Sequence, residues 1–108
     1  SILRALPLGS ITVEEMPAHL GKIVSMLGYY VHKKNAITSR KEMMNFGTFL
    51  DQDGYFLDSV HFPVVANKYP FRGRGLYKIT GKVVEEFGFP SIEVEKMARL
   101  EIKEDPRG

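Results

Sequence analysis

The chain has 108 residues and no cysteine, and its 15 basic residues exceed its 13 acidic residues to give a net charge of +2. This length suits one domain with a modest core and excludes a catalytic domain joined to a second, regulatory one. The lack of cysteine excludes disulfides, thiolate metal sites and cysteine nucleophiles, and it agrees with a cytoplasmic location.

The chain begins with Ser1 instead of methionine, so we expect a piece of a longer chain. Residues 1–19 are predicted to be a lead-in segment with a short helical turn. Thr12 and Glu15 match a capping box, and Pro17 limits the helix to a turn or two. The apolar runs of the chain fall far short of the roughly 20 residues that a membrane-spanning helix needs, so no membrane partner is expected.

Residues 22–34 form the first predicted strand. They are rich in β-prone apolar residues and contain Gly28 in the middle. A glycine inside such a strand is typical of a bulge or sharp bend, which lets one long strand serve two sheets of a closed barrel. Residues 33–42 are polar and basic without alternation and are predicted to form the loop to the second strand.

A hairpin is predicted between residues 46 and 62. Residues 46–50 and 55–62 are β-prone runs, and the polar turn between them contains Asp-Gly, a strong hairpin signal. Pro63 cannot donate to a strand ladder and ends the second run. These runs would be the second and third strands of a small barrel.

Asp51 and Asp53 lie in the turn of this hairpin and could suggest a calcium or catalytic site. The next positions of a calcium-binding loop would be filled by Tyr55 and Phe56, which carry no suitable ligand. Aspartates are also common in hairpin turns because their side chains bond to nearby backbone N–H groups. We therefore interpret both as turn residues.

The second half of the chain predicts two further strands. Residues 64–74 form a connection with room for one turn of helix. Residues 76–84 and 91–96 alternate between apolar and polar side chains, which is typical of half-buried strands. The turn between them is predicted at residues 85–90, and residues 104–108 are predicted to be a frayed tail.

Five strands with the longest first and no long helix predict an all-β fold. The pattern fits the five-stranded Greek-key barrel called the OB-fold, with a short N-terminal helical turn. We place this domain at residues 20–103. An SH3-like barrel, with shorter strands, is the nearest alternative.

Five segments follow one another in the order LGKIVSMLGYYV, MMNFGTFLDQDG, VHFP, YKITGKVVEEFG and SIEVEKM. In this order and spacing the segments resemble the OB-fold domain in the C-terminal part of bacterial DNA polymerase III alpha subunits. The resemblance covers residues 20–97. Ten residues occupy the places of this family's pattern: Met44, Phe46, Phe49, Asp51, Gly54, Phe62, Pro63, Gly81, Lys82 and Val83. The chain departs from it at Phe49, where leucine is commoner, and in residues 38–41, which lack the family's glycine.

The resemblance implies a non-catalytic module whose parent chain is a DNA-directed DNA polymerase, a nucleotidyltransferase. The catalytic carboxylates of that family belong to another domain and correspond to no residue here. Single-stranded DNA, the other domains of the polymerase and accessory subunits of the replisome are the implied partners.

Charge is segregated along the chain although its sum is small. Residues 16–41 and residues 59–84 each carry five lysines and arginines and no acid. Between residues 85 and 105, seven acidic residues outnumber three basic ones. This pattern predicts one positive face and one negative end.

An OB-fold binds single strands across its second and third strands, through aromatic stacking and a basic groove. The basic candidates are Lys33, Lys34, Arg40, Lys41, Arg72, Arg74, Lys78 and Lys82. The stacking candidates combine an apolar ring with a polar tip, and they are Tyr29, Tyr30, Tyr55 and His61. Phe46, Phe49 and Phe62 are predicted to fill the barrel core instead.

Three functions stay open at this point. The first is binding of single-stranded DNA, and the second is docking of a protein within the replisome. The third is RNA binding of the anticodon type, in which 2′-hydroxyl groups are read.

No cofactor or metal is predicted, because His19, His32 and His61 are far apart in sequence and lack suitably spaced acidic partners.

Overall fold

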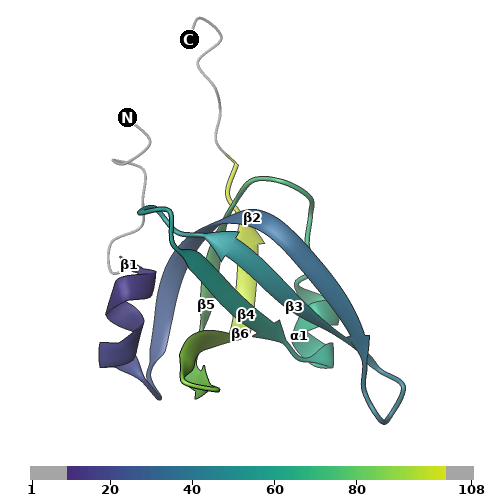
Figure 1. Ribbon diagram of the computed structural model, residues 1–108. Helices are drawn as coiled ribbons and strands as arrows, with labels where there is room; N and C mark the ends of the chain where they lie inside the picture. Colours follow the sequence, from purple (N-terminus) through teal and green to yellow (C-terminus); the bar gives the residue numbers. More distant parts are fainter. Residues whose placement is uncertain (1–9, 102–108) are drawn as a thin grey trace, which may run out of the picture.

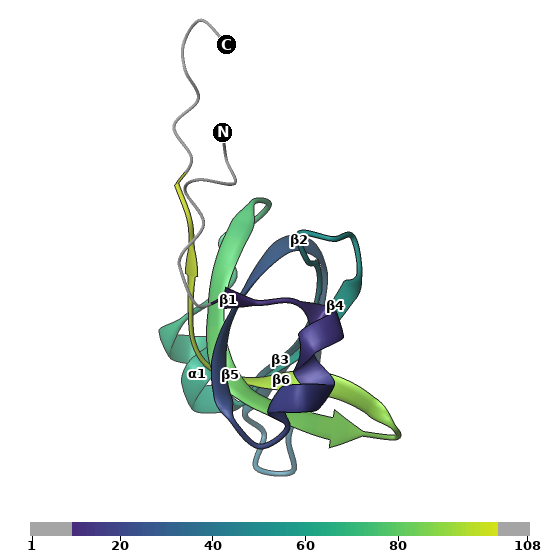
Figure 2. The same cartoon turned by 90° about the vertical axis from the view of Figure 1, so that its left-hand side faces the viewer.

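The computed structural model describes residues 10–101, which form a closed β-barrel (Figures 1 and 2). Its strands are β1 (Ser10–Ile11), β2 (Ile23–Ile37), β3 (Met43–Leu50), β4 (Phe56–His61), β5 (Leu76–Glu86) and β6 (Phe89–Arg99). The 3₁₀ helix η2 (Val13–His19) precedes β2, and α1 (Pro63–Lys68) follows β4. The predicted tail and the first nine residues of the lead-in lie outside the described residues.

Strands β2 to β6 make the barrel in the order β2-β3-β4-β6-β5, and β2 also pairs with β5 to close it. β4 and β6 run parallel, whereas the other pairs in the barrel are antiparallel. This is the Greek-key order of the OB-fold, so the predicted fold class is confirmed. The two-residue strand β1 is an addition that pairs with β2 in parallel.

The long strand β2 serves both halves of the barrel, as Gly28 predicts. Residues 23–29 pair with β5, and residues 29–37 pair with β3. Gly28 lies at the change-over, where an added Cβ would stand 2.7 Å from the Cβ of Phe49. The missing side chain thus lets the core residue of β3 come close to β2, and a register shift just beyond it completes the bend.

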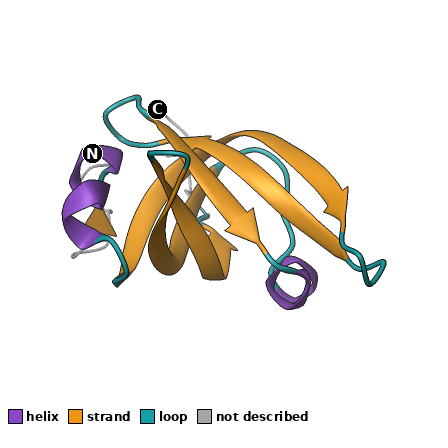
Figure 3. Cartoon of the chain, turned by 60° about the horizontal axis from the view of Figure 1, so that its bottom comes forward, coloured by secondary structure: helices purple, strands orange, loops and turns teal. Residues whose placement is uncertain are grey.

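The hairpin of β2 and β3 is longer than predicted. β2 continues to Ile37, so the predicted loop of residues 33–42 is wrong in its first half and shrinks to a turn of residues 38–42. Polar side chains in this arm pair across the strands, and Nδ2 of Asn45 donates to Oδ1 of Asn35 at 2.7 Å. The arm extends beyond the barrel (Figures 1 and 3).

The turn between the last two strands is also shorter than predicted. Instead of residues 85–90, only Phe87 and Gly88 separate β5 from β6. The cross-strand partners continue as far as Glu86 and Phe89. This hairpin is therefore paired almost to its tip.

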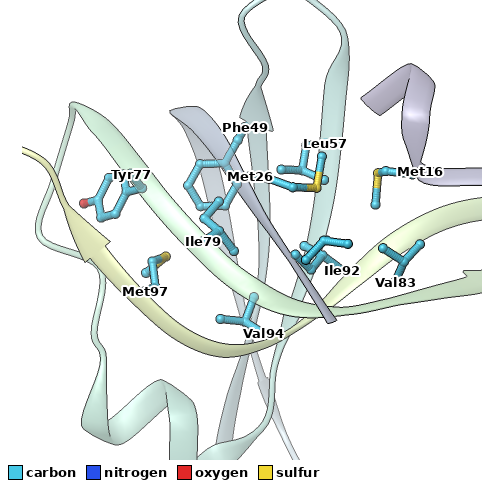
Figure 4. Close-up of a cluster of buried hydrophobic side chains, with 11 residues drawn as sticks. Met16, Met26, Phe49, Leu57, Tyr77, Ile79, Val83, Ile92, Val94 and Met97 are labelled. Atoms are coloured by element: carbon cyan, nitrogen blue, oxygen red, sulfur yellow. The ribbon is translucent and has the colours of Figure 1, made fainter. Parts of the chain in front are cut away.

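The core fills the barrel from one end to the other (Figure 4). Tyr77 lies at one end, Phe49 near the middle and Met16 of η2 at the other. The alternation predicted for β5 and β6 is confirmed, with inward side chains that are almost fully buried: Tyr77, Ile79, Val83, Ile92 and Val94. Because Met16 is wholly buried, η2 is part of this core.

The helix η2 begins with the predicted capping box. The backbone N–H of Thr12 donates to the carboxylate of Glu15 at 3.0 Å, and the threonine hydroxyl reaches the same oxygen at 3.1 Å. Pro17 lies inside the helix, which has seven residues. The short helical turn predicted from the sequence is therefore confirmed.

Asp51 has the turn role that the sequence predicts. Its Oδ1 accepts the backbone N–H groups of Asp53 and Tyr55, each at 2.9 Å. Its Oδ2 accepts the N–H of Val13, also at 2.9 Å. One carboxylate thus joins the β3–β4 turn to the start of η2.

Replacing Asp51 with asparagine tests this link. If the amide keeps its oxygen toward the turn, its NH₂ group faces the donating N–H of Val13, so a part-buried donor loses its acceptor. Such a loss costs about 1–3 kcal/mol. We expect Asp51→Asn to lower the free energy of unfolding in urea by this amount, while Asp53→Asn at an exposed position of the same turn changes it little. Equal effects of the two substitutions would contradict the assigned role.

Candidate nucleic-acid interface

Five of the seven phenylalanines of the chain are exposed. They are Phe46, Phe56, Phe62, Phe87 and Phe89, and together they are named here the phenylalanine face. Full burial of one such side chain contributes about 1.5–3 kcal/mol, so phenylalanine is normally found in the core. Because exposed rings are unusual on a protein surface, this surface is the candidate for a binding site.

The alternation of the strands determines which rings point outward. Phe49 is fully buried, and Phe46 lies three residues before it on β3, so their side chains are on opposite faces. Leu57 is buried on β4, which places Phe56 on the outer face. The prediction that Phe49 fills the core is confirmed, but the same prediction for Phe46 and Phe62 is wrong.

A groove of about 300 Å³ lies between the outer face of β3 and β4 and the β5–β6 turn. The β5–β6 hairpin projects from the barrel beside these strands (Figures 1 and 2). The apolar lining comes from both sides, namely Phe46, Val60, Phe87, Phe89 and Pro90. Two acidic residues, Asp58 and Glu86, line the same groove. Its character is therefore aromatic and acidic, not basic.

Polar residues cross the apolar sheet face in one row. Thr48 of β3 is opposite His32 of β2 and Asp58 of β4. The neighbouring row places Lys34 opposite Phe46, and residues directly opposite in an antiparallel pair share a face. A positive charge therefore lies beside an exposed ring, one row away from a negative charge.

Four of the predicted basic residues belong to the β2–β3 hairpin. Lys34 is on the outer face, and Arg40 and Lys41 are exposed in the turn at the end of the same arm (Figures 1 and 3). Lys33 points to the opposite side, where its Nζ lies 5.5 Å from the ring centroid of Phe71. Three cations therefore lie along the arm, and Lys34 is the one that stands directly beside a ring of the phenylalanine face.

The other four predicted basic residues lie elsewhere on the barrel. Arg72 and Arg74 are exposed between α1 and β5, and Lys78 and Lys82 are on the outward side of β5. In the barrel order β5 lies between β6 and β2, so it adjoins neither β3 nor β4. The structure thus divides the predicted cations between two sides of the barrel and does not bring them into one groove.

Tyr30 is packed against the core. Its ring centroid lies 5.5 Å from that of Phe71, 6.3 Å from Phe49 and 6.4 Å from Tyr77. Tyr30 is half-buried, and it packs on the edge of the core, where a barrel end needs large side chains to close it. Its stacking on a base stays a prediction.

Tyr55 is exposed, next to the β3–β4 turn. A hydrogen bond with Glu14 is the largest cause that raises the pKa of Tyr55, and the negative charge of that carboxylate adds to it. Tyr55 therefore interacts with η2 and is absent from the groove lining. Tyr29 is likewise half exposed on β2, outside the groove.

His61 is completely buried. Its Nε2 lies 2.8 Å from Oγ of Ser59, its ring centroid is 4.8 Å from that of Phe71, and its Nδ1 has no partner. Burial lowers the pKa of His61 to about 4, so its imidazole is neutral at physiological pH. The prediction that His61 stacks on a base at the surface is wrong.

The sequence carried a usable signal for the residues that were missed. Phe46 and Phe49 differ by three positions, which cannot place both inside a regular strand. No comparable pattern shows that Asp58 of β4 and Glu86 of β5 line one groove, because β6 separates their strands in the barrel and only the folded β5–β6 hairpin brings Glu86 to it.

The described residues hold no group of three side chains suited to bind a metal ion. No helix among them is long and apolar enough to cross a membrane. Comparison of the chain with models of protein families and with curated proteins gave no match. The class of ligand is therefore inferred from the side chains of the phenylalanine face and the groove.

The buried imidazole predicts a pH-dependent stability. Above pH 6.5 His61 is neutral in both the folded and the unfolded chain. Below pH 6.5 His61 is protonated in the unfolded chain, whereas in the folded chain it stays neutral down to about pH 4. The folded state therefore loses stability as the pH falls. Between pH 7 and pH 5 this loss is about 2 kcal/mol.

Urea unfolding at pH 7 and pH 5 measures this effect. We expect His61→Phe to remove most of the loss between the two pH values. The exposed-site variant His32→Gln keeps the buried imidazole and serves as the control, which should lose stability as the original chain does. An unchanged pH dependence in His61→Phe would show that other groups cause it.

Proposed function

We propose that this chain is a single-stranded DNA-binding OB module of a replicative DNA polymerase of the DNA polymerase III alpha kind, acting in the cytoplasm. The module binds the strand and does no chemistry itself. The observation that carries the proposal is the phenylalanine face, whose five exposed rings lie on β3, on β4, at the start of α1 and on the β5–β6 hairpin. Three of these rings, Phe46, Phe87 and Phe89, line the groove. The sequence resemblance over residues 20–97 supports the polymerase context, in which other domains and accessory subunits are further partners.

Stacking supplies the main attraction in this proposal. Each base that stacks on an aromatic side chain contributes about 1–3 kcal/mol, with little regard to sequence. Three engaged rings would give on the order of 3–9 kcal/mol before the cost of ordering the strand. The outer face of the second and third barrel strands is where OB-folds bind oligonucleotides, and β3 and β4 hold these positions here.

Charge indicates how the strand would lie. Asp58 and Glu86 in the groove repel phosphates, whereas Lys34, Arg40 and Lys41 attract them along the β2–β3 arm. The bases therefore face the groove and the phosphates face the arm. Three phosphate contacts correspond to a slope of about −2 for the logarithm of the binding constant against the logarithm of the salt concentration.

A protein partner is the second candidate, and the acidic lining of the groove favours it. An extended segment with apolar side chains and one or two lysines would match the rings together with Asp58 and Glu86. Such a partner belongs to the replisome in this alternative. RNA binding is the third candidate and would need contacts to 2′-hydroxyl groups.

Fluorescence anisotropy with a labelled oligo-dT tests the first candidate. We expect binding at low salt that weakens with the slope of about −2 given above. Phe46→Ala and Phe56→Ala should each weaken binding by roughly 5- to 150-fold without changing the slope, because each removes one stacking ring. Lys34→Gln and Arg40→Gln should each flatten the slope by about 0.7.

Two controls locate the site. Val64→Ala, at an exposed position on α1, and Lys82→Gln, on β5, should leave the affinity and the slope nearly unchanged. A flatter slope with Lys82→Gln would place the strand on the β5 side instead. Tighter binding of oligo-rU than of oligo-dT favours the RNA alternative. No binding of either oligonucleotide at low salt would contradict the proposal.

A further inference from the structure

Phe87 occupies an unfavourable backbone conformation at the tip of the β5–β6 hairpin. Its φ is 53°, that of Gly88 is 82°, and the two residues form the whole loop between Glu86 and Phe89. Two positive φ values in a two-residue hairpin loop define a type I′ turn, in which asparagine, aspartate or glycine is favoured. A bulky residue in this region is an outlier.

No packing within the described residues compensates for this conformation. The Phe87 side chain is 97% exposed, so its ring has no contact that would offset the strain. Asparagine at this position would give the Asn-Gly pair preferred in such turns. A strained residue that contributes no stability suggests a role in binding.

The groove shows what the ring of Phe87 would meet. Phe87 lines one side of the groove and Phe46 lines the other, and both rings are exposed. A flat, uncharged occupant fits between aromatic side chains. The carboxylates of Asp58 and Glu86 repel an anionic group there, yet they can accept hydrogen bonds from the N–H groups on the edges of bases, such as N3–H of thymine.

We propose that Phe87 closes the groove over one nucleobase, which stacks against the Phe87 ring while it lies on the outer face of β3 and β4. This inference rests on the proposed function. It names Phe87 as the residue that contacts the base on the side of the groove opposite β3 and β4. The phosphates flanking that base lie outside the groove, toward Lys34 beside Phe46. The local strain at Phe87 is then retained because the ring is needed at the tip.

Three substitutions at this one position separate strain from stacking. Phe87→Asn relieves the strain and removes the ring, so we expect a melting temperature higher by about 4–8 °C and binding of oligo-dT weaker by roughly 5- to 150-fold. Phe87→Leu keeps an apolar side chain and the strain, so binding should weaken without a rise in melting temperature. Phe87→Tyr keeps the ring and should bind like the original chain.

The outcomes distinguish this inference from the function on which it rests. If the original chain binds oligo-dT and Phe87→Asn binds equally well, the role of Phe87 is overturned while the module remains a DNA-binding one. Equal binding by Phe87→Leu also overturns it, because an apolar cover would then suffice. If the original chain does not bind oligo-dT at all, the proposed function fails first.

Discussion

Closure of the barrel through β2 is the constraint on which the rest of the structure depends. Because residues 23–29 pair with β5 and residues 29–37 pair with β3, five strands enclose one narrow interior. Phe49 and Tyr77 fill much of that interior, and only alternate residues of each strand point into it. Large side chains at the outward positions of the strands are left on the outer surface. The exposure of Phe46 on β3 and of Phe56 on β4 is thus a consequence of this alternation.

A closed barrel also makes such a surface tolerable. Exposed apolar strands are hazardous chiefly at sheet edges, where free N–H and C=O groups invite pairing with another chain. β3 pairs with β2 over its whole length and with β4 from Asn45 to Leu50, whereas β4 pairs with β6 only at Ser59 and Val60. The ring of Phe46 on β3 is therefore exposed without a free backbone edge beside it.

The sequence predicted those features that depend on neighbouring residues. Gly28, the turn at Asp51 and the alternation of β5 follow from local spacing, and together they were enough for the fold class. The exposure of Phe46 could have been predicted from its distance of three residues to Phe49. The burial of His61 could not, because it depends on Phe71, which reaches the same place from another part of the chain. The division of the cations between two sides of the barrel likewise follows from the strand order, which cannot be inferred from runs of charged residues in the sequence.

The separation of apolar and charged groups limits the ligands that fit the site. A uniformly anionic polymer would bind poorly in a groove that holds Asp58 and Glu86, and a wholly apolar one would gain nothing from Lys34 at its edge. Single-stranded nucleic acid has flat uncharged bases on one side and phosphates on the other, so each part has a matching region. In a duplex the bases are paired and stacked inside, where Phe46 and Phe87 cannot reach their faces. The geometry therefore favours a strand whose bases are free.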